Sequence, residues 1–597
     1  MFTMRYLLLI GWLWLFAVGL ELRADDSVAF ASPADLWQGY DPTALPLEVE
    51  SLEKWHENAS AFEKLRFTAE EVDGSKVRVF AISGLPLAGP AQPGILHIHG
   101  GGQTASLEWV RFWTQRGYAC VTYDFCGPWA ERTEVTDWGR LKHGNMAHAQ
   151  GGHQVAPTPR ASSWYHWTLA ARRALTLLAK LPGVDPERLG IFGISVGGTL
   201  CWSVAGSDAR VKTAVPIYGC GYNEDGRRTR WGFGKLTPEL ALFQRAVSPE
   251  AHAPFITCPV LYLNATNDFH GWMDSAYDIL SATGAPTWQA FTPRQNHHIG
   301  PAQGSDLPAW MDYQLKGGPP FPASPTISLR LTLAGIPLAN VCTSDSPVDH
   351  VDVFYSLTDK PPPNRFWRSV QADRDGTSWQ AELPVLDVWE PVFAFANVHY
   401  TSGVCLTTNL ERRVPGMLGK SRATLRPGDP LAPRAIAESW FYARAYTDPQ
   451  IEKTFVKIED TSERPDVVSL NPEVMGDPIS VDVSSHVIGD PQFAGPAGYS
   501  LAFDCSGDFG PVGLRVAVTQ NDWTPLAQTF VVTVSTAELP AGWNTIVLPL
   551  DRFKMKESDK TPARWQDLDK INLQGTTPKA RPFRIANIRW ISEPATK

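Results

Sequence analysis

Residues 188–200 read RLGIFGISVGGTL, and this stretch decides the fold of the first half of the chain. Its beginning is short and apolar, as in a buried strand, and its end predicts a helix that continues to Ala205. Between them stands Gly193-Ile194-Ser195-Val196-Gly197, a G-x-S-x-G pattern at an abrupt strand-to-helix turn. Glycines two residues to either side let neighbouring backbone approach closely, and the strained turn exposes the Oγ of Ser195. The pattern therefore predicts a nucleophilic serine at this position.

Apolar stretches that predict strands alternate with helical stretches on both sides of this turn. Near-continuous apolar strands in such an alternation favour a mostly parallel sheet with helices on both faces. Asp73-Gly74 predicts a hairpin between the first two strands, which would form an antiparallel edge. We therefore expect an α/β domain with an eight-stranded, mostly parallel sheet. The predicted strands are Leu65–Val72, Lys76–Ile82, Ile95–His99, Tyr118–Asp124, Arg188–Ile194, Thr213–Tyr218, Val260–Ala265 and Thr287–Phe291, and the longest predicted helix is Trp164–Leu181.

Candidate partners for the serine follow the last two predicted strands. Asp268 comes after the seventh strand, and His297 and His298 come after the eighth. In a serine triad the histidine accepts the hydroxyl proton, while the aspartate fixes the imidazole tautomer and stabilises its cation. We expect Ser195, Asp268 and His297 to form such a triad, with Asp274 as the alternative acid and His298 as the alternative base.

Donors for an oxyanion hole are predicted on two loops. His99-Gly100-Gly101-Gly102 ends the third predicted strand, where such a loop can direct backbone N–H groups into a site. We expect the backbone N–H of Val196 and that of either Gly101 or Gly102 to bind the developing oxyanion. His99 itself is expected to be structural.

A long aromatic insertion, residues 125–163, separates the fourth predicted strand from the long helix. Loops of this length without regular structure are usually functional or disordered, and the aromatic content argues against disorder. We expect Trp129 and Trp138 to line a substrate pocket, with His270 as a further wall. A surface loop that packs on its own aromatic rings is the alternative.

No metal or cofactor is expected. His143, His148 and His153 recur every five residues, which does not match the i, i+4 spacing of ligands on a helix. The sequence also lacks an H-E-x-x-H motif, a phosphate-binding loop and a dinucleotide-binding fingerprint.

Two further domains are predicted beyond the linker Gly317-Gly318-Pro319-Pro320, where helical periodicity ends and short strands begin. A second break, residues 426–430, divides this all-β part into two sandwiches. Cys342 and Cys405 lie at opposite ends of the first and are either a disulfide or two buried thiols. The expected domains are an α/β domain at residues 25–318, a small Ig-like β-sandwich at 323–425 and a jelly-roll β-sandwich at 435–597.

Composition and the first residues bear on location and partners. The chain has 597 residues, and its 53 Lys and Arg against 62 Asp and Glu give a net charge of −9, which excludes a basic nucleic-acid binder. Eight cysteines are too few for a disulfide framework. Residues 1–24 have the charged start and the apolar run of a signal peptide, so we expect a secreted or periplasmic protein with no membrane association after cleavage. An uncleaved membrane anchor is the alternative.

The sequence resembles the α/β-hydrolase superfamily, and within it the dienelactone hydrolase, acetylxylan esterase and prolyl-oligopeptidase-like groups. The resemblance spans residues 60–315 and rests on five features: His99–Gly102, the lead-in Val184–Gly190, Gly193–Gly198, Asp268 and His297. One departure is the serine, since dienelactone hydrolase proper uses cysteine. Another is the absence of an N-terminal propeller of the prolyl-oligopeptidase kind.

The last domain resembles carbohydrate-binding jelly rolls of the galactose-binding-like kind. The stretches Trp543–Leu550, Trp565–Ile571 and Ile588–Trp590 carry this resemblance. It implies carbohydrate binding by exposed rings, although Trp543 and Trp590 at alternating spacing are also typical of core residues.

Together these features predict an exported carboxylic ester hydrolase that deacylates a polysaccharide or a small ester through an acyl-enzyme. The alternatives are a prolyl-oligopeptidase-like peptidase or amidase, and a catalytically inactive carbohydrate-binding surface protein.

Overall fold

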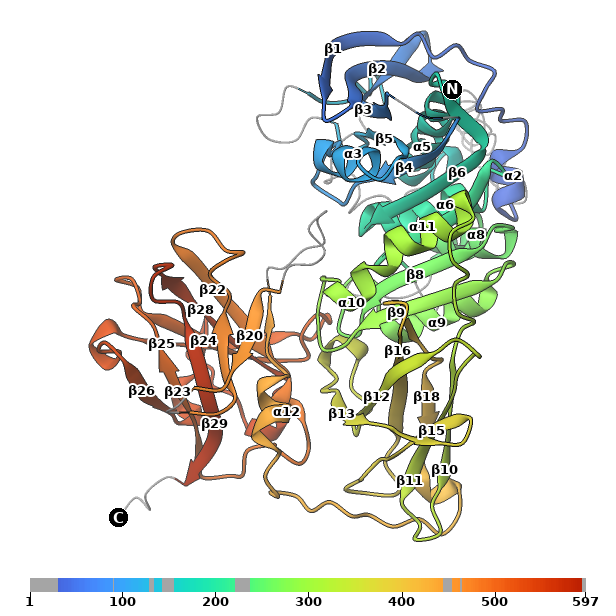
Figure 1. The fold of residues 1–597 in the computed structure, drawn as a ribbon. Coiled ribbons are helices and arrows are strands. Elements are labelled where there is room, and N and C mark those ends of the chain that lie inside the picture. Colours follow the sequence, from blue (N-terminus) through green and yellow to red (C-terminus); the bar gives the residue numbers. More distant parts are fainter. Residues whose placement is uncertain are drawn as a thin grey trace, which may run out of the picture. The chain divides into compact units, whose positions relative to one another are not determined.

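The structure, a computed structural model, describes residues 30–87, 89, 91–127, 134–141, 155–220, 237–443, 454–461 and 464–592 (Figure 1). It consists of two compact units, and the division runs through the α/β part of the chain. The first unit contains residues 1–212, 234–258 and 282–285, and the second contains residues 213–233, 259–281 and 286–597. Within the described ranges, every helix is too short or too polar to cross a lipid bilayer. The predicted signal peptide lies outside these ranges.

The first unit contains six strands in the order β1-β2-β3-β5-β4-β6. The strands are β1 (Glu50–Glu57), β2 (Ser60–Val72), β3 (Ser75–Pro86), β4 (Gln92–Ile98), β5 (Ala119–Tyr123) and β6 (Val184–Ile194). β1, β2, β3 and β5 pair antiparallel, whereas β4 pairs in parallel with both β5 and β6. The main helices are α3 (Leu107–Thr114), α5 (Ser163–Lys180) and α6 (Val196–Ala205). The predicted antiparallel edge and parallel interior are confirmed.

One strand of this sheet was not expected. β1 reads ESLEKWHE, and its first five residues are exposed. Because it is an outer strand in which half of the residues are charged, it lacks the apolar alternation on which strand prediction depends. The described α/β part therefore has nine strands, where the sequence predicts eight.

The second unit begins with three parallel strands, β7 (Val211–Ile217), β8 (Val260–Ala265) and β9 (Thr287–Thr292). Their helices include α9 (Met273–Ala282), α10 (Pro301–Gly304) and α11 (Asp306–Lys316). All three strands are close to their predicted positions because each is a short apolar run. With the six strands above, they confirm the expected mixed α/β fold.

The next part of the second unit is all β. Its two sheets have the orders β10-β11-β15-β14 and β13-β12-β16-β17, with β18 paired to β16. In β10 every second side chain is buried, which is the period of a strand with one face on a core. The strands are β10 (Thr326–Leu331), β11 (Pro337–Cys342), β12 (Val348–Ser356), β13 (Arg368–Gln371), β14 (Asp373–Asp375), β15 (Ser378–Glu382), β16 (Val392–Tyr400), β17 (Cys405–Thr407) and β18 (Glu411–Arg413).

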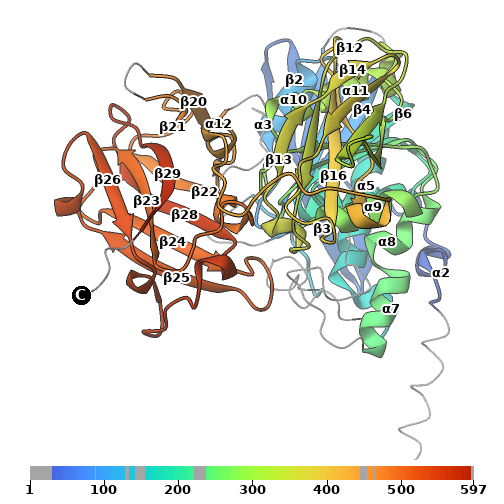
Figure 2. The same cartoon turned by 90° about the horizontal axis from the view of Figure 1, so that it is seen from below.

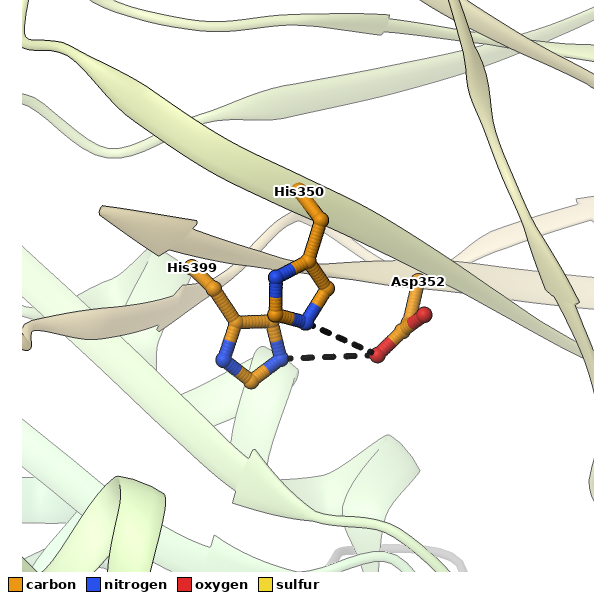
Figure 3. Close-up of side chains that lie close together, drawn as sticks. All are labelled: His350, Asp352 and His399. Carbon is orange, nitrogen blue, oxygen red and sulfur yellow. Dashed lines mark ion pairs between the residues drawn. The ribbon is translucent and has the colours of Figure 1, made fainter. Parts of the chain in front are cut away.

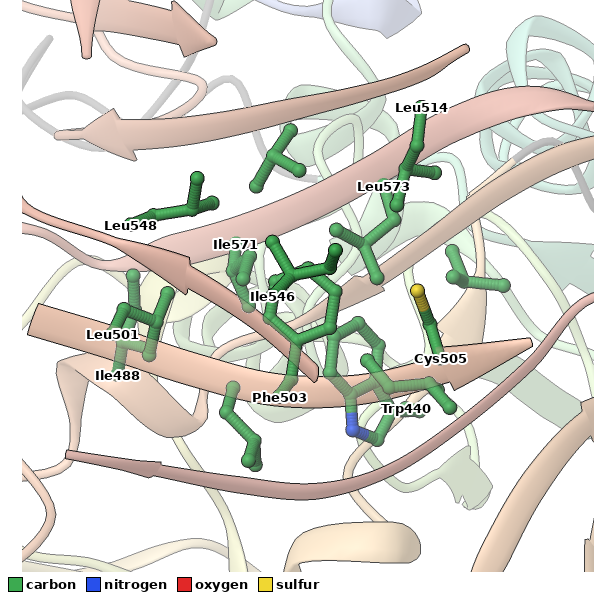
Figure 4. Close-up of a cluster of buried hydrophobic side chains, with 14 of the residues drawn as sticks. Trp440, Ile488, Leu501, Phe503, Cys505, Leu514, Ile546, Leu548, Ile571 and Leu573 are labelled. Atoms are coloured by element: carbon green, nitrogen blue, oxygen red, sulfur yellow. The ribbon is translucent and has the colours of Figure 1, made fainter. Parts of the chain in front are cut away.

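The C-terminal part forms a second sandwich with the sheet orders β19-β22-β28-β24-β25-β27 and β20-β21-β29-β23-β26. Figure 2 shows the two sheets as layers, and Figure 4 shows Phe503, Leu573 and other members of the core they share. Both expected all-β regions are therefore present. The strands are β19 (Phe441–Tyr442), β20 (Val456–Glu459), β21 (Val467–Leu470), β22 (Ile479–Ser485), β23 (Tyr499–Ser506), β24 (Leu514–Gln520), β25 (Gln528–Val534), β26 (Trp543–Leu548), β27 (Lys554–Met555), β28 (Lys570–Thr577) and β29 (Arg584–Ser592).

The two sandwiches are joined by buried polar contacts. The guanidinium of Arg368 donates two hydrogen bonds to the carboxylate of Asp490, at 2.9 and 2.5 Å. Lys360 forms an ion pair with Asp569 at 2.7 Å. No disulfide contributes, because all eight cysteines lie in the described residues and each is a free thiol, including Cys342 and Cys405.

Candidate active site

The predicted nucleophile lies at the tip of a strained turn. β6 ends at Ile194, α6 begins at Val196, and Ser195 between them has φ 59° and ψ −116°. A residue with a β-carbon in such a conformation costs on the order of 1–3 kcal/mol and persists only where the surroundings enforce it. The strand-to-helix turn expected from the sequence is therefore present with its expected strain.

Backbone contacts explain the two flanking glycines. A β-carbon on Gly193 would collide with the carbonyl group of Gly197, and one on Gly197 would collide with the carbonyl oxygens of Ile98 and His99. A side chain at position 197 would force the turn away from the end of β4, and one at position 193 would force the strand away from the start of α6. The G-x-S-x-G pattern is thus a packing requirement of this turn.

The glycine loop after β4 is anchored by His99. Its ring stacks on Phe125 with centroids 4.1 Å apart, and its Nε2 accepts a hydrogen bond from the backbone N–H of Phe125 at 3.2 Å. Nδ1 must then carry the proton, which it donates to the carbonyl oxygen of Gly100 at 2.7 Å. His99 therefore has the structural role that we expected.

The predicted oxyanion donors lie on this loop and at the start of α6. The N–H of Gly100 is bonded to the side chain of Gln103, at 2.9 Å. Gly101 and Gly102 are partly exposed, and Gly102 has the positive φ of 71° that glycine tolerates. Their role and that of the Val196 N–H stay predictions.

The second unit brings the predicted acid and base together. Asp268 follows β8 and His297 follows β9, and the Asp268 Oδ2 lies 2.5 Å from the His297 Nδ1. Asp268 is fully buried, and its Oδ1 accepts hydrogen bonds from the backbone N–H groups of His270, at 2.7 Å, and Gly271. A carboxylate on Nδ1 fixes the proton there, so that Nε2 is the nitrogen able to accept a proton.

The alternative acid and base have other contacts. Asp274 forms a bidentate ion pair with Arg365, at 2.6 and 2.8 Å. The ring of His298 packs against Phe455 at 5.5 Å between centroids. The geometry therefore favours Asp268 and His297 over both alternatives.

The first β-sandwich braces the two loops that carry this pair. The side-chain amide of Asn267, next to Asp268, donates to the carbonyl oxygens of Pro363 and Arg365 at 3.1 and 2.8 Å. Arg294, three residues before His297, is buried and donates to the carbonyl oxygen of Trp367 at 2.8 Å. Burial lowers the pKa of the Arg294 guanidinium, and the neighbouring Glu438 opposes that shift. The segment 360–369 thus holds both loops.

Aromatic rings surround the imidazole of His297. Tyr218 lies 4.1 Å from it and Phe269 lies 4.7 Å from it, between ring centroids. Trp523, from the β24–β25 loop, stacks on Phe269 at 4.5 Å and 20°. His270, an expected pocket wall, is buried with its ring 6.0 Å from that of His297. Sequence patterns did not predict Trp523 at this place, because it belongs to a different predicted domain.

The expected aromatic lid is only partly described. Trp129 and the three evenly spaced histidines lie outside the described residues. Trp138 is inside them and is 3% exposed, packed near the bridge between Arg78 and Asp137. Its place in a substrate pocket stays a prediction.

A group able to bind a metal ion lies elsewhere in the second unit. Among the described residues, His350, Asp352 and His399 are the one set of three or more His, Cys, Asp or Glu side chains with mutually close ligand atoms. None of them was among the residues expected to have a function.

Two family models match the α/β part of the chain. The dienelactone hydrolase family matches residues 162–289, and the acetyl xylan esterase family matches residues 44–225. The matches include the serine turn and the loop that carries Asp268, and they support a hydrolase of the esterase type. No curated protein matches the chain.

The solved structures that align with part of this chain are distant in sequence. Acetyl xylan esterase 1 from a Thermoanaerobacterium species is 17% identical over 45% of this chain and 88% of that chain, with a TM-score of 0.38. An acetyl xylan esterase from a Paenibacillus species is 15% identical over 46% and 91%, with a TM-score of 0.36. A puromycin-hydrolyzing peptidase from Mycobacterium tuberculosis is 17% identical over 47% and 49%, with a TM-score of 0.32.

Proposed function

We propose that this protein, whose residues 44–289 belong to the α/β-hydrolase group, is an exported serine esterase that removes acyl groups from a polysaccharide. The observation that carries the proposal is the Asp268–His297 pair, in which a buried carboxylate holds the Nδ1 of a histidine that follows the last parallel strand. The strained turn at Ser195 supports it from the other unit. Export rests on the signal-like residues 1–24.

The reaction we propose has two acyl transfers. The Oγ of Ser195 attacks the ester carbonyl carbon while its proton moves to the Nε2 of His297. The tetrahedral oxyanion accepts hydrogen bonds from the N–H groups of Val196, Gly101 and Gly102, and its collapse expels the sugar alkoxide, which takes the proton from His297. Water then gives a proton to His297 and attacks the acyl-enzyme, releasing the carboxylic acid and restoring the Ser195 hydroxyl.

The rings beside His297 suit a sugar ester. Sugar rings present flat C–H faces that stack on aromatic side chains, and Phe269 and Trp523 form a stacked pair beside the base. We assign Trp523 to the wall that contacts the sugar bearing the acyl group. We therefore propose a sugar ester, rather than a free aliphatic ester, as the substrate.

A fluorophosphonate probe tests the serine directly. We expect the full-length protein to be labelled and S195A to remain unlabelled, since the probe phosphonylates an activated serine hydroxyl. S305A, which removes an exposed serine of the α/β part, is the matched control and should label like the wild type. Labelling of S195A at the wild-type rate would exclude Ser195 as the nucleophile, and a folded but unlabelled wild type would favour an inactive binding protein.

The choice between esterase and peptidase is tested with paired substrates. We expect hydrolysis of p-nitrophenyl acetate and release of acetate from acetylated xylan, with little cleavage of proline-containing amides. An amide leaving group must be protonated by His297 before it departs, which a site for sugar alkoxides does not require. Faster cleavage of the amides would support the peptidase alternative.

Carbohydrate binding by the C-terminal sandwich is a second proposal, supported by a cavity of about 730 Å³. Tyr499, Asn587, Arg589 and Trp590 line part of it, and the combination of rings and hydrogen-bonding groups suits a sugar. The full-length S195A variant should be retained on insoluble xylan, cellulose or pectin, and Y499A in the same background should be retained less. Equal retention of both, or none on any polysaccharide, counts against this site.

A further inference from the structure

Two strands of the first β-sandwich bring two histidines and an aspartate to one face (Figure 3). His350 on β12 is the cross-strand partner of His399 on β16. Asp352 lies two residues along β12, and residues two apart on a strand share a face. The three side chains are partly buried and point toward one another in Figure 3. The pairing of the two strands therefore fixes the relative positions of all three.

The spacing of their polar atoms suits a metal ion better than hydrogen bonds. The Asp352 Oδ2 lies 3.6 Å from the His350 Nε2 and 3.5 Å from the His399 Nε2. Both distances exceed the roughly 2.7–3.2 Å of an N–H···O hydrogen bond. A tetrahedral zinc ion with bonds of about 2.0–2.2 Å holds its ligand atoms roughly 3.3–3.6 Å apart. The observed separations fall in that range.

A fourth side chain orients one of the ligands. The Nδ1 of His350 lies 2.8 Å from the Oδ2 of Asp349, so the proton is held on Nδ1 and the lone pair is on Nε2, which faces Asp352. A carboxylate bonded to the distal nitrogen of a ligating histidine is the usual outer support of a zinc site. Asp349 is therefore a positioning residue rather than a ligand.

The two imidazole rings contact each other and a side chain of the neighbouring strand β17. The imidazoles of His350 and His399 stack with centroids 4.1 Å apart and an angle of 10°. The thiol of Cys405, from β17, lies 3.8 Å from the Nε2 of His399 and accepts a hydrogen bond from Gln303. Because the lone pair of an imidazole nitrogen lies in the plane of the ring, binding of one ion by both Nε2 atoms requires one of the stacked rings to rotate.

The donor set selects the class of cation. Two imidazole nitrogens and one carboxylate oxygen suit zinc and the later first-row metals, whereas calcium and magnesium prefer oxygen ligands alone. Asp352 also lines a cavity of about 610 Å³, which offers room for water beside its carboxylate. We propose that His350, Asp352 and His399 bind one Zn²⁺ ion, with water in the fourth position, and that the ion links β12 to β16.

Metal titration of the whole chain tests the proposal. Untagged, chelator-treated full-length protein is titrated with zinc chloride, desalted and assayed for zinc by elemental analysis. We expect one zinc ion per chain for the wild type and for H56Q, which changes an exposed histidine on β1, and none for the H350Q/H399Q double variant. Equal zinc in the wild type and the double variant, or no zinc in the wild type, would overturn the proposal.

A second measurement keeps the test independent of folding. Co²⁺ added to the wild type should give the visible absorption bands of a tetrahedral site, and excess zinc should remove them. D352N retains both rings and the strand pairing, so it should remain folded by circular dichroism and bind Zn²⁺ at least tenfold more weakly. Unchanged affinity in folded D352N, or an octahedral cobalt spectrum in the wild type, would contradict the three-ligand site.

Discussion

The Asp268–His297 pair and the His350–Asp352–His399 cluster use the same two residue types in different ways. In both places an aspartate holds the Nδ1 of a histidine, at 2.5 Å for Asp268 and 2.8 Å for Asp349. Beside His297 this carboxylate is fully buried, and aromatic rings surround the imidazole. Beside His350 a second imidazole and a second carboxylate face Nε2.

What faces Nε2 therefore separates the two chemistries. In both places a carboxylate holds the proton on Nδ1, so the lone pair on Nε2 is the one available for chemistry. With one imidazole and a serine as the proposed partner, Nε2 exchanges a proton. In the cluster, where the Oδ2 of Asp352 lies 3.5–3.6 Å from two imidazole Nε2 atoms, the proposed role of Nε2 is to donate a lone pair to a cation. The predictions below test this difference, from the largest expected effect to the smallest.

Removing the proposed base should have the largest effect. H297A should lower the kcat for p-nitrophenyl acetate by about 10⁴–10⁶-fold, since it removes the group proposed to accept the Ser195 proton. H298Q is the matched control, because it changes the adjacent histidine, whose ring packs on Phe455, and it should stay within tenfold of the wild type. A loss in H298Q as large as that in H297A would reverse the assignment.

Replacing the two orienting aspartates should separate the sites. D268N should lower kcat by roughly 10⁴-fold, because an amide at this position favours the wrong imidazole tautomer. D349N and D352N should leave esterase activity within twofold of the wild type under the same assay. A loss of esterase activity in D352N equal to that in D268N would show that the His350–Asp352–His399 cluster takes part in catalysis.

Replacing Asp349, which orients His350 in the proposed zinc site, should have an intermediate effect on zinc binding. D349N should weaken zinc binding by about 10–100-fold, since the carboxylate sets the ring orientation and basicity of His350. Isothermal titration calorimetry of the folded variant measures this change, with D345N on the preceding turn as the control. Wild-type affinity in D349N would mean that His350 is not held by its neighbour.

The smallest effect on activity is expected from replacing Trp523, the residue proposed to contact the sugar. W523A should raise the KM for acetylated xylan about 2–10-fold, the amount expected from losing one ring contact of 0.5–1.5 kcal/mol. The kcat for p-nitrophenyl acetate should change less than twofold. W389A removes a tryptophan that is 67% exposed in the first sandwich and serves as the control. Equal effects on both substrates would argue against a role in sugar recognition.

The sequence predicted the features that local patterns encode. The Gly193–Gly197 turn, the polar residues after β8 and β9, and the apolar strands all show in short windows, and the structure has them where they were expected. β1 was missed because its charged residues show no alternation. Trp523 and the His350–His399 pair were missed for a different reason, because only strand pairing and domain packing, both long-range, bring these residues to their neighbours.

The buried ion pair between Arg368 and Asp490 bears on how such a chain can be recombined. With side chains 9% and 1% exposed, each charge depends on the other for its partner. Replacing either sandwich alone by an unrelated one would leave a buried charge without its partner. The expected loss in the free energy of unfolding is about 3–5 kcal/mol. The two sandwiches should therefore be exchanged or deleted together in any chimera built on this hydrolase.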